Sequence, residues 1–266
     1  MKQIQTSSKK QATPPAPPQK SEIIDNSIFQ KKFWLVIGLF LLTTLIFFWQ
    51  HIVGNSFFWE DFVEYVFPVR NLAAREFASG SIPFWNPYSL GGMPFFADIQ
   101  VGFFYPFNFI LTLFVNQDGL LPIWILQFIV IIHFFFAQFN TFILSRYLKI
   151  SFWGSIIAAI SFSFAFPIVL HIIHPMIVFH LTWLPLIFYF FLRALNNSSI
   201  KDGAIAGLIF GLTMLSGHPQ ITLYFALFFG TYFLWDLIAR LIKKSDVNRV
   251  TGKYILSGVL TFIIAV

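Results

Sequence analysis

A long, uncharged and mostly apolar run decides the fold: residues 119–145 read GLLPIWILQFIVIIHFFFAQFNTFILS. The run contains no Asp, Glu, Lys or Arg, and Arg146 and Lys149 follow directly after it. A helix rises about 1.5 Å per residue, so this run is long enough to cross a hydrocarbon core about 30 Å thick. We therefore expect a transmembrane helix here.

The composition of the whole chain also indicates a membrane protein. Its 266 residues are 57% hydrophobic and 11% charged, whereas soluble proteins carry about 25% charged residues. Most of the surface must therefore face a lipid bilayer. The absence of cysteine excludes disulfides and thiolate metal sites. The net charge of +6 does not indicate a nucleic-acid partner, because the basic residues lie in the gaps between apolar runs.

Further apolar runs of helix length lie on both sides of this one. They cover residues 33–50, 152–170, 175–192, 204–215, 221–237 and 254–266. Together the runs predict an all-α polytopic membrane protein with about seven transmembrane helices, the first at 33–50 and the others within 119–266. The last run is short for a full span, so we expect a truncated helix and a chain that is the N-terminal part of a longer protein.

The distribution of charge predicts the orientation of the chain. Residues 1–32 are polar and Pro-rich, which is typical of a disordered tail. If this tail is cytoplasmic, all Lys and Arg residues except Arg70 and Arg75 lie on the cytoplasmic side. The N-terminus is therefore expected in the cytoplasm, and residues 51–118 form a long first loop on the extracytoplasmic side.

Two segments of this loop are expected at the membrane surface. Residues 61–79 predict an amphipathic interfacial helix, with Phe62 and Val66 on its apolar face and Glu64, Arg70 and Glu76 on other faces. Residues 103–115 are too short for a comfortable span, and counting them as one would move the basic residues after 145 to the outside. We therefore interpret them as a re-entrant or interfacial segment.

The carboxylates at the start of this loop are the first candidate site residues. Asp61, with Glu60 as its close competitor, follows the first predicted transmembrane helix. Asp61 could cap the amphipathic helix, as acidic residues at helix starts often do. It could equally act as a general base on a hydroxyl of a lipid-linked substrate at headgroup depth.

The middle of the loop is rich in turns and aromatic residues. Trp85, Asn86 and Tyr88 lie in a Pro- and Gly-rich segment that favours a plain loop with interfacial anchors, although aromatic rings of this kind also stack on sugars. Asp98 and Gln100 follow on the same loop. Asp98 is a second candidate carboxylate of a site or a solvated loop acid, with nothing in the sequence to separate the two.

Histidines mark the two short outer turns. His171 and His174 lie on one turn and His218 on the other, where Gln220 follows. A single histidine is more often structural, but three on the side of the acidic loop could bind a phosphate, relay a proton or ligate a divalent metal.

Three other polar positions have structural interpretations. His133 and His180 fall inside predicted spans, where polar groups usually face the bundle interior. Asp236 is spaced to pair with Arg240 one helical turn later.

A family resemblance is carried by a set of short motifs. They are Trp59-Glu60-Asp61, Gly80-Ser81-Ile82-Pro83-Phe84-Trp85-Asn86-Pro87-Tyr88, Gly91-Gly92-Met93-Pro94-Phe95, Asp98, Phe104-Tyr105-Pro106, Thr182-Trp183-Leu184-Pro185-Leu186 and Gly217-His218-Pro219-Gln220. With these motifs the chain resembles bacterial YfhO-type membrane proteins, which are similar to the GT-C class of integral membrane glycosyltransferases.

The resemblance implies a GT-C-like bundle in the bacterial plasma membrane. It implies transfer of a sugar from a polyprenyl-phosphate donor to a cell-envelope glycan, lipid or protein acceptor. In that class a carboxylate of the first outer loop acts as the catalytic base or organises the acceptor, and Asp61 matches its position. The leaving group is already a phosphate, so no nucleotide cofactor is expected, and the sequence shows no Gly-rich phosphate loop.

Two other classes of function remain open from the sequence. A transporter or flippase of lipid-linked glycans would need polar residues along a path through the bilayer, and the spans contain few of them. A non-catalytic envelope assembly protein is excluded by no feature of the sequence.

Overall fold

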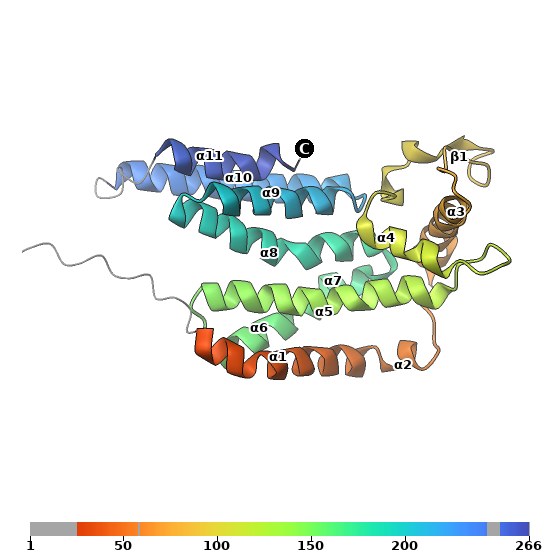
Figure 1. The fold of residues 1–266 in the computed structure, drawn as a ribbon, viewed down its shortest axis with the longest axis horizontal. Helices are drawn as coiled ribbons and strands as arrows, with labels where there is room; N and C mark the ends of the chain where they lie inside the picture. The colour runs from red at the N-terminus through yellow and green to blue at the C-terminus, as the bar shows by residue number, and fades with distance from the viewer. Residues whose placement is uncertain (1–25, 58, 244–250, 266) are drawn as a thin grey trace, which may run out of the picture.

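The computed structural model describes residues 26–57, 59–243 and 251–265, and in this part the chain is mostly helical (Figure 1). The longer helices are α1 (Asn26–Phe47), α5 (Ile123–Tyr147), α6 (Phe152–Ser163), α8 (Pro175–Asn197), α9 (Ile200–Met214), α10 (Pro219–Ile242) and α11 (Gly252–Ile263). Residues 1–25 of the expected tail lie outside the described residues. Its last residues already belong to α1, which begins at Asn26 rather than at residue 33.

The segments between these helices contain further elements, of which only α3 exceeds six residues. Between α1 and α5 lie α2 (Trp49–Ile52), the π-helical turn η1 (Phe62–Val66), α3 (Phe67–Ala78), β1 (Trp85–Asn86), β2 (Met93–Pro94), η2 (Phe95–Ala97), η3 (Ile99–Val101), α4 (Pro106–Leu111) and η4 (Thr112–Phe114). Between α6 and α8 lie α7 (Phe166–Leu170) and η5 (His171–Ile173). The strands β1 and β2 pair antiparallel as a two-residue ribbon.

The described residues contain four helical segments that are long and apolar enough to cross a membrane. These are Ile123–Tyr147, Phe152–Ile173, Pro175–Asn197 and Pro219–Ile242. The apolar part of α1, Lys32–Phe47, and the whole of α11 are shorter. The architecture is thus that of an all-helical membrane protein, as the composition predicts.

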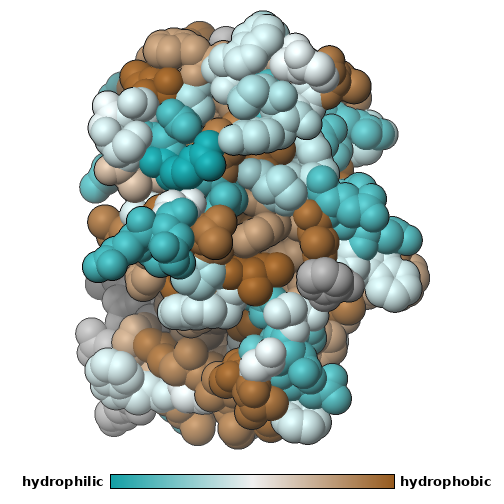
Figure 2. Space-filling view, turned by 90° about the vertical axis from the view of Figure 1, so that its right-hand side faces the viewer, coloured by the Kyte–Doolittle hydropathy of each residue, from teal (hydrophilic) through white to brown (hydrophobic). Residues whose placement is uncertain are grey.

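The long helices lie side by side, and the segment between α1 and α5 gathers at one end of them (Figure 1). Successive helices run in opposite directions, so the turn between α7 and α8 and the turn between α9 and α10 lie at this same end (Figure 1). We call this part of the molecule the loop end and define it as residues 51–57, 59–122, 171–174 and 215–218. Figure 2 views the loop end directly and shows hydrophilic side chains interspersed with hydrophobic ones.

The segment between α1 and α5 is docked on the bundle by its own apolar side chains. Phe62 and Val66 of η1, together with Tyr105 and Leu111, belong to one buried cluster with α5 and the first half of α8. Phe62 and Tyr105 are completely buried. The burial of such large side chains, about 1.5–3 kcal/mol for a Phe, holds this segment against the helices.

A second buried cluster joins α8 to α9, α10 and α11. On α9, Gly203, Gly207 and Gly211 recur every four residues and face α11. A Cβ atom on Gly207 would lie 2.7 Å from the carbonyl oxygen of Leu260. These glycines therefore allow the two helix backbones to approach closely, as small residues do between membrane helices.

The structure confirms the sequence-based interpretation of three polar residues within the bundle. His133 and His180 are completely buried. Asp236 accepts a hydrogen bond from Nε of Arg240 at 2.8 Å, and also one from the hydroxyl of Tyr254 at 2.9 Å. The second bond was not predicted, because Tyr254 belongs to a different helix.

Candidate functional site

The candidate site is centred on a contact between Asp61 and His174. Nε2 of His174 lies 2.8 Å from Oδ2 of Asp61, although 113 positions separate the two residues. Asp61 directly precedes the η1 turn, and His174 directly precedes α8. The docking of η1 on α8 therefore brings the carboxylate to the imidazole. The side chains are 57% and 32% exposed, so the pair is open to a ligand.

His171 extends this pair into a chain of three side chains. Its Nδ1 lies 3.4 Å from Nδ1 of His174, and the backbone of His174 donates to the carbonyl of His171. If Nε2 of His174 donates to Asp61, Nδ1 of His174 is free to accept from His171. The arrangement can then orient the carboxylate and share a proton along the chain.

His218 lies near the same group but has a different local role. Its Nδ1 accepts a hydrogen bond from the backbone N–H of Ile221 at 3.4 Å, so it caps the start of α10. Burial lowers the pKa of His218, and its proximity to His171 and His174 lowers it further. Gln220 is exposed, and its amide donates to the hydroxyl of Tyr224 at 2.6 Å.

Glu60 is exposed beside Asp61 and has no hydrogen bond or ion pair with any other described residue. Its backbone has a φ of +34°, a value that residues other than glycine seldom adopt. This turn directs the chain into η1, and only Asp61 of the two acids contacts a histidine. Of these two adjacent acids, the fold therefore brings only Asp61 to the histidines.

Asp98 is engaged in a separate contact within the loop. Its Oδ2 accepts from the hydroxyl of Tyr65 at 2.5 Å, and its Oδ1 accepts from the backbone N–H of Gln100 at 3.1 Å. Burial and the neighbouring Asp98 carboxylate raise the pKa of Tyr65. Asp98 thus links η3 to η1 through Tyr65, which lies four residues after Asp61. Gln100 is exposed.

The aromatic turn forms the β1–β2 ribbon. Asn86 is buried and uses its side chain inside the turn, where Nδ2 donates to Ser89 at 3.0 Å and Oδ1 accepts from the backbone of Tyr88 at 3.0 Å. Trp85 and Tyr88 are 56% and 74% exposed. Within the described residues, no hydrogen bond or ring contact joins these three side chains to the histidines. They form a second exposed surface on the loop rather than part of the Asp61 group.

No three His, Cys, Asp or Glu side chains in the described part of the chain are arranged to hold a metal ion. Asp61, His171 and His174 form a chain of contacts rather than a common centre. The contacts of His174 with Asp61 and with His171 can transfer a proton along these side chains.

Two features of the loop end were missed by sequence reasoning. Arg70, expected on a polar face of the interfacial helix, is instead only 3% exposed. That expectation is wrong, because α3 is covered by η1, α4 and η4. Tyr105 places its hydroxyl 2.6 Å from Nε2 of His133 and accepts from Nε1 of Trp183 at 2.8 Å. Only the presence of these polar residues in apolar surroundings could have signalled such contacts.

The chain matches no protein-family model, no curated protein sequence and no solved structure. The four long apolar helices define the class as an all-helical membrane protein, and its bundle carries a carboxylate–histidine contact at one end. Any more particular assignment rests on the residues themselves.

Proposed function

We propose that this chain belongs to a membrane glycosyltransferase of the GT-C type. The enzyme transfers a sugar from a polyprenyl-phosphate donor to a cell-envelope glycan, lipid or protein on the extracytoplasmic side of a bacterial plasma membrane. The loop end then faces the outside, and α1, α9 and α11 complete a bundle of about seven membrane helices. The observation that carries the proposal is the contact of Asp61 with His174 at the end of the bundle.

Asp61 is suited to act as the general base of this reaction. One of its oxygens is held by His174 at 2.8 Å, and its exposure leaves the other oxygen open to an acceptor hydroxyl. In the transfer step the acceptor oxygen bonds to the anomeric carbon while Asp61 takes the hydroxyl proton. The bond from the anomeric carbon to the phosphate oxygen breaks, and its electron pair leaves with the polyprenyl phosphate.

The polar groups inside the bundle favour this reading over a transporter. Gln138 is hydrogen-bonded to Thr43 and Thr44, and Asn140 donates to the carbonyl of Thr182. His180 contacts Thr222 and Ser216. These side chains satisfy one another and join helices, whereas a path for a lipid-linked glycan needs polar groups that are free to contact it.

The test is the substitution Asp61→Asn in the whole protein, assayed in membranes with a radiolabelled short-chain polyprenyl-phosphate hexose. We expect incorporation into envelope material to fall by about 100- to 10,000-fold, the range for loss of a general base. His174→Gln keeps a donor at a similar position and should lower transfer less than His174→Ala.

Asp118→Asn is the matched control, because Asp118 is an exposed acid of the same loop. It should leave transfer unchanged. Unchanged transfer in Asp61→Asn would remove Asp61 from the mechanism, and movement of the labelled lipid across liposomes without any transfer product would favour the transporter.

A further inference from the structure

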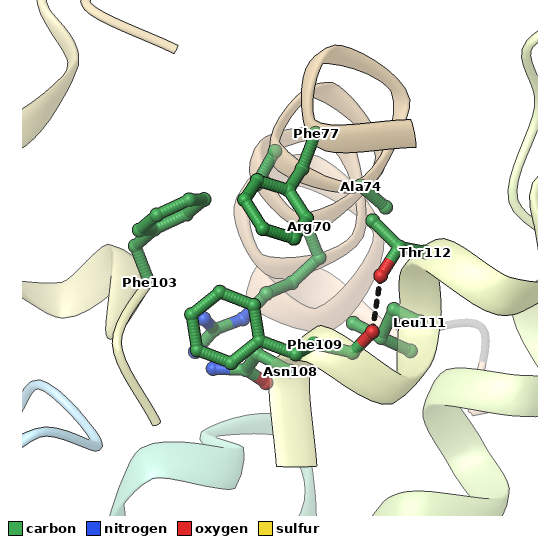
Figure 3. A pocket seen from close by; sticks show the side chains of 9 residues that line it. Arg70, Ala74, Phe77, Phe103, Asn108, Phe109, Leu111 and Thr112 are labelled. Atoms are coloured by element: carbon green, nitrogen blue, oxygen red, sulfur yellow. Dashed lines mark hydrogen bonds between the residues drawn. The ribbon is translucent and has the colours of Figure 1, made fainter. Parts of the chain in front are cut away.

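The side chains of Arg70 on α3 and Asn108 on α4 leave three buried polar atoms without a hydrogen-bond partner among the described residues. These atoms are Nη1 and Nη2 of Arg70 and Oδ1 of Asn108. Arg70 is 3% exposed and Asn108 is 8% exposed. Nδ2 of Asn108 donates to the carbonyl of Gly102 at 2.6 Å, and a Cβ atom on Gly102 would lie 3.2 Å from Nη2 of Arg70. The two side chains therefore lie next to each other (Figure 3).

The charge of Arg70 is not neutralised by an ion pair within the described residues. Asp98 acts on it electrostatically, but the two oxygens of Asp98 accept from Tyr65 and from the backbone N–H of Gln100. Burial lowers the pKa of Arg70 to about 10, and Tyr65, Asp98 and Tyr105 offset part of this shift. Arg70 therefore stays protonated at neutral pH, and its buried N–H groups need an acceptor.

Arg70 and Asn108 line the same small cavity (Figure 3). Its volume is about 10 Å³, which is about the space that a single water molecule needs. The rings of Phe77, Phe103 and Phe109 contact one another with centroids 5.3 to 5.9 Å apart. Most of the wall is therefore apolar, and the remaining lining residues are Ala73, Ala74, Leu111 and Thr112.

We propose that this cavity is a binding site for one water molecule that joins Arg70 to Asn108. The unpaired groups are donors on Arg70 and an acceptor on Asn108, so their ligand must both accept and donate hydrogen bonds. The oxygen of a water molecule can accept from Nη1 and Nη2 while one of its O–H groups donates to Oδ1 of Asn108. This makes about three hydrogen bonds, which is typical of a buried water. An anion such as chloride accepts from Arg70 but has no proton to donate to Asn108.

The water molecule fastens parts of the loop end that are distant in the sequence. No direct hydrogen bond joins the side chains of Arg70 and Asn108, so the water is the link between α3 and α4 at this point. Gly102, which accepts from Asn108, packs so closely on the turn between α9 and α10 that a Cβ atom would collide with the backbone oxygen of Ser216. The bridge therefore stabilises the crossing of the loop over this turn, whether or not the chain transfers a sugar.

The first experiment is a double-mutant cycle on the thermal unfolding midpoint of the full chain in detergent micelles. Asn108→Leu should lower the midpoint, because it removes the acceptor of the bridge. The drop should be smaller in an Arg70→Met background, where the water has already lost its two donors and the oxygen of Asn108 is unpaired. Arg75→Met is the control background, because Arg75 lies on the same helix but is exposed and paired with Glu76 at 3.5 Å. There the drop should equal that in the wild type.

The second experiment identifies the ligand as water. The full chain is equilibrated in water labelled with oxygen-18 and irradiated with X-rays, and ring hydroxylation is mapped by mass spectrometry. We expect labelled hydroxylation of Phe103, which lines the cavity, and its loss in the double variant Arg70→Met with Asn108→Leu. Phe95 is the control ring, because it belongs to the same buried cluster as Phe103 but does not line the cavity.

Equal drops for Asn108→Leu in all three backgrounds would overturn the proposal, because the two side chains would then not be coupled. Labelling of Phe103 that persists in the double variant, or that never exceeds the labelling of Phe95, would also overturn it. A wild-type midpoint that rises with chloride at constant ionic strength, but not in Arg70→Met, would assign the cavity to an anion instead. If a variant does not fold, the labelling of Phe103 against Phe95 in the wild type still decides.

Discussion

Removal of the Tyr105 hydroxyl tests whether the loop is locked to the bundle by hydrogen bonds. The hydroxyl is completely buried and joins three segments: it lies 2.6 Å from Nε2 of His133 on α5 and 2.8 Å from Nε1 of Trp183 on α8. Nδ1 of His133 lies 2.6 Å from the carbonyl of Ile129, so Nε2 is the nitrogen left to accept from Tyr105.

The substitution Tyr105→Phe keeps the ring and removes both bonds. Nε2 of His133 and the indole N–H of Trp183 then both lose their hydrogen-bond partner. Each buried polar group that is left without a partner costs about 1–3 kcal/mol. Hydrogen bonds between membrane helices contribute only about 0.6 kcal/mol on average. We therefore use the lower end of the 1–3 kcal/mol range for each of the two groups, about 1 kcal/mol. We therefore expect the free energy of unfolding to fall by about 2 kcal/mol.

Denaturant unfolding in micelles, followed by tryptophan fluorescence, measures this change. Tyr88→Phe is the matched control, because Tyr88 is 74% exposed and its change should stay within about 0.5 kcal/mol. A cycle with Trp183→Phe should give a coupling energy of at least about 0.5 kcal/mol with Tyr105→Phe. If Tyr105→Phe is as stable as the wild type, and its effect adds to that of Trp183→Phe without coupling, the Tyr105 hydrogen bonds do not hold the loop to the bundle.

Two further predictions concern packing and pH. Gly207→Leu should separate α9 from α11, because its first side-chain atom already meets the carbonyl of Leu260. The thermal unfolding midpoint should therefore fall, whereas Gly230→Leu on α10, with open space around it, should leave the midpoint unchanged. The folded chain holds the pKa of His218 below the ordinary 6.5, so the unfolded state binds the proton first and stability should decline as pH falls below about 6.5. His218→Gln should flatten this decline in thermal unfolding, and an identical pH profile would exclude His218 as its source.

The class of fold follows from the sequence alone. Apolar runs such as 119–145 and the scarcity of charge specify membrane helices, because transfer of a side chain into lipid depends on that side chain itself. The sequence also places His171, His174 and His218 on two short turns, because these residues lie between neighbouring apolar runs. Motif and charge position were sufficient to select Asp61 and these histidines as candidates.

Only the tertiary structure decided which of these candidates meet. Asp61 contacts His174 across 113 positions, while Asn86 and Asp98 use their side chains within the loop. Arg70 is buried despite its charge. Periodicity records which side of a helix is apolar, but contacts between distant segments depend on how η1, α3, α4 and α8 pack, and that packing is a property of all their side chains together.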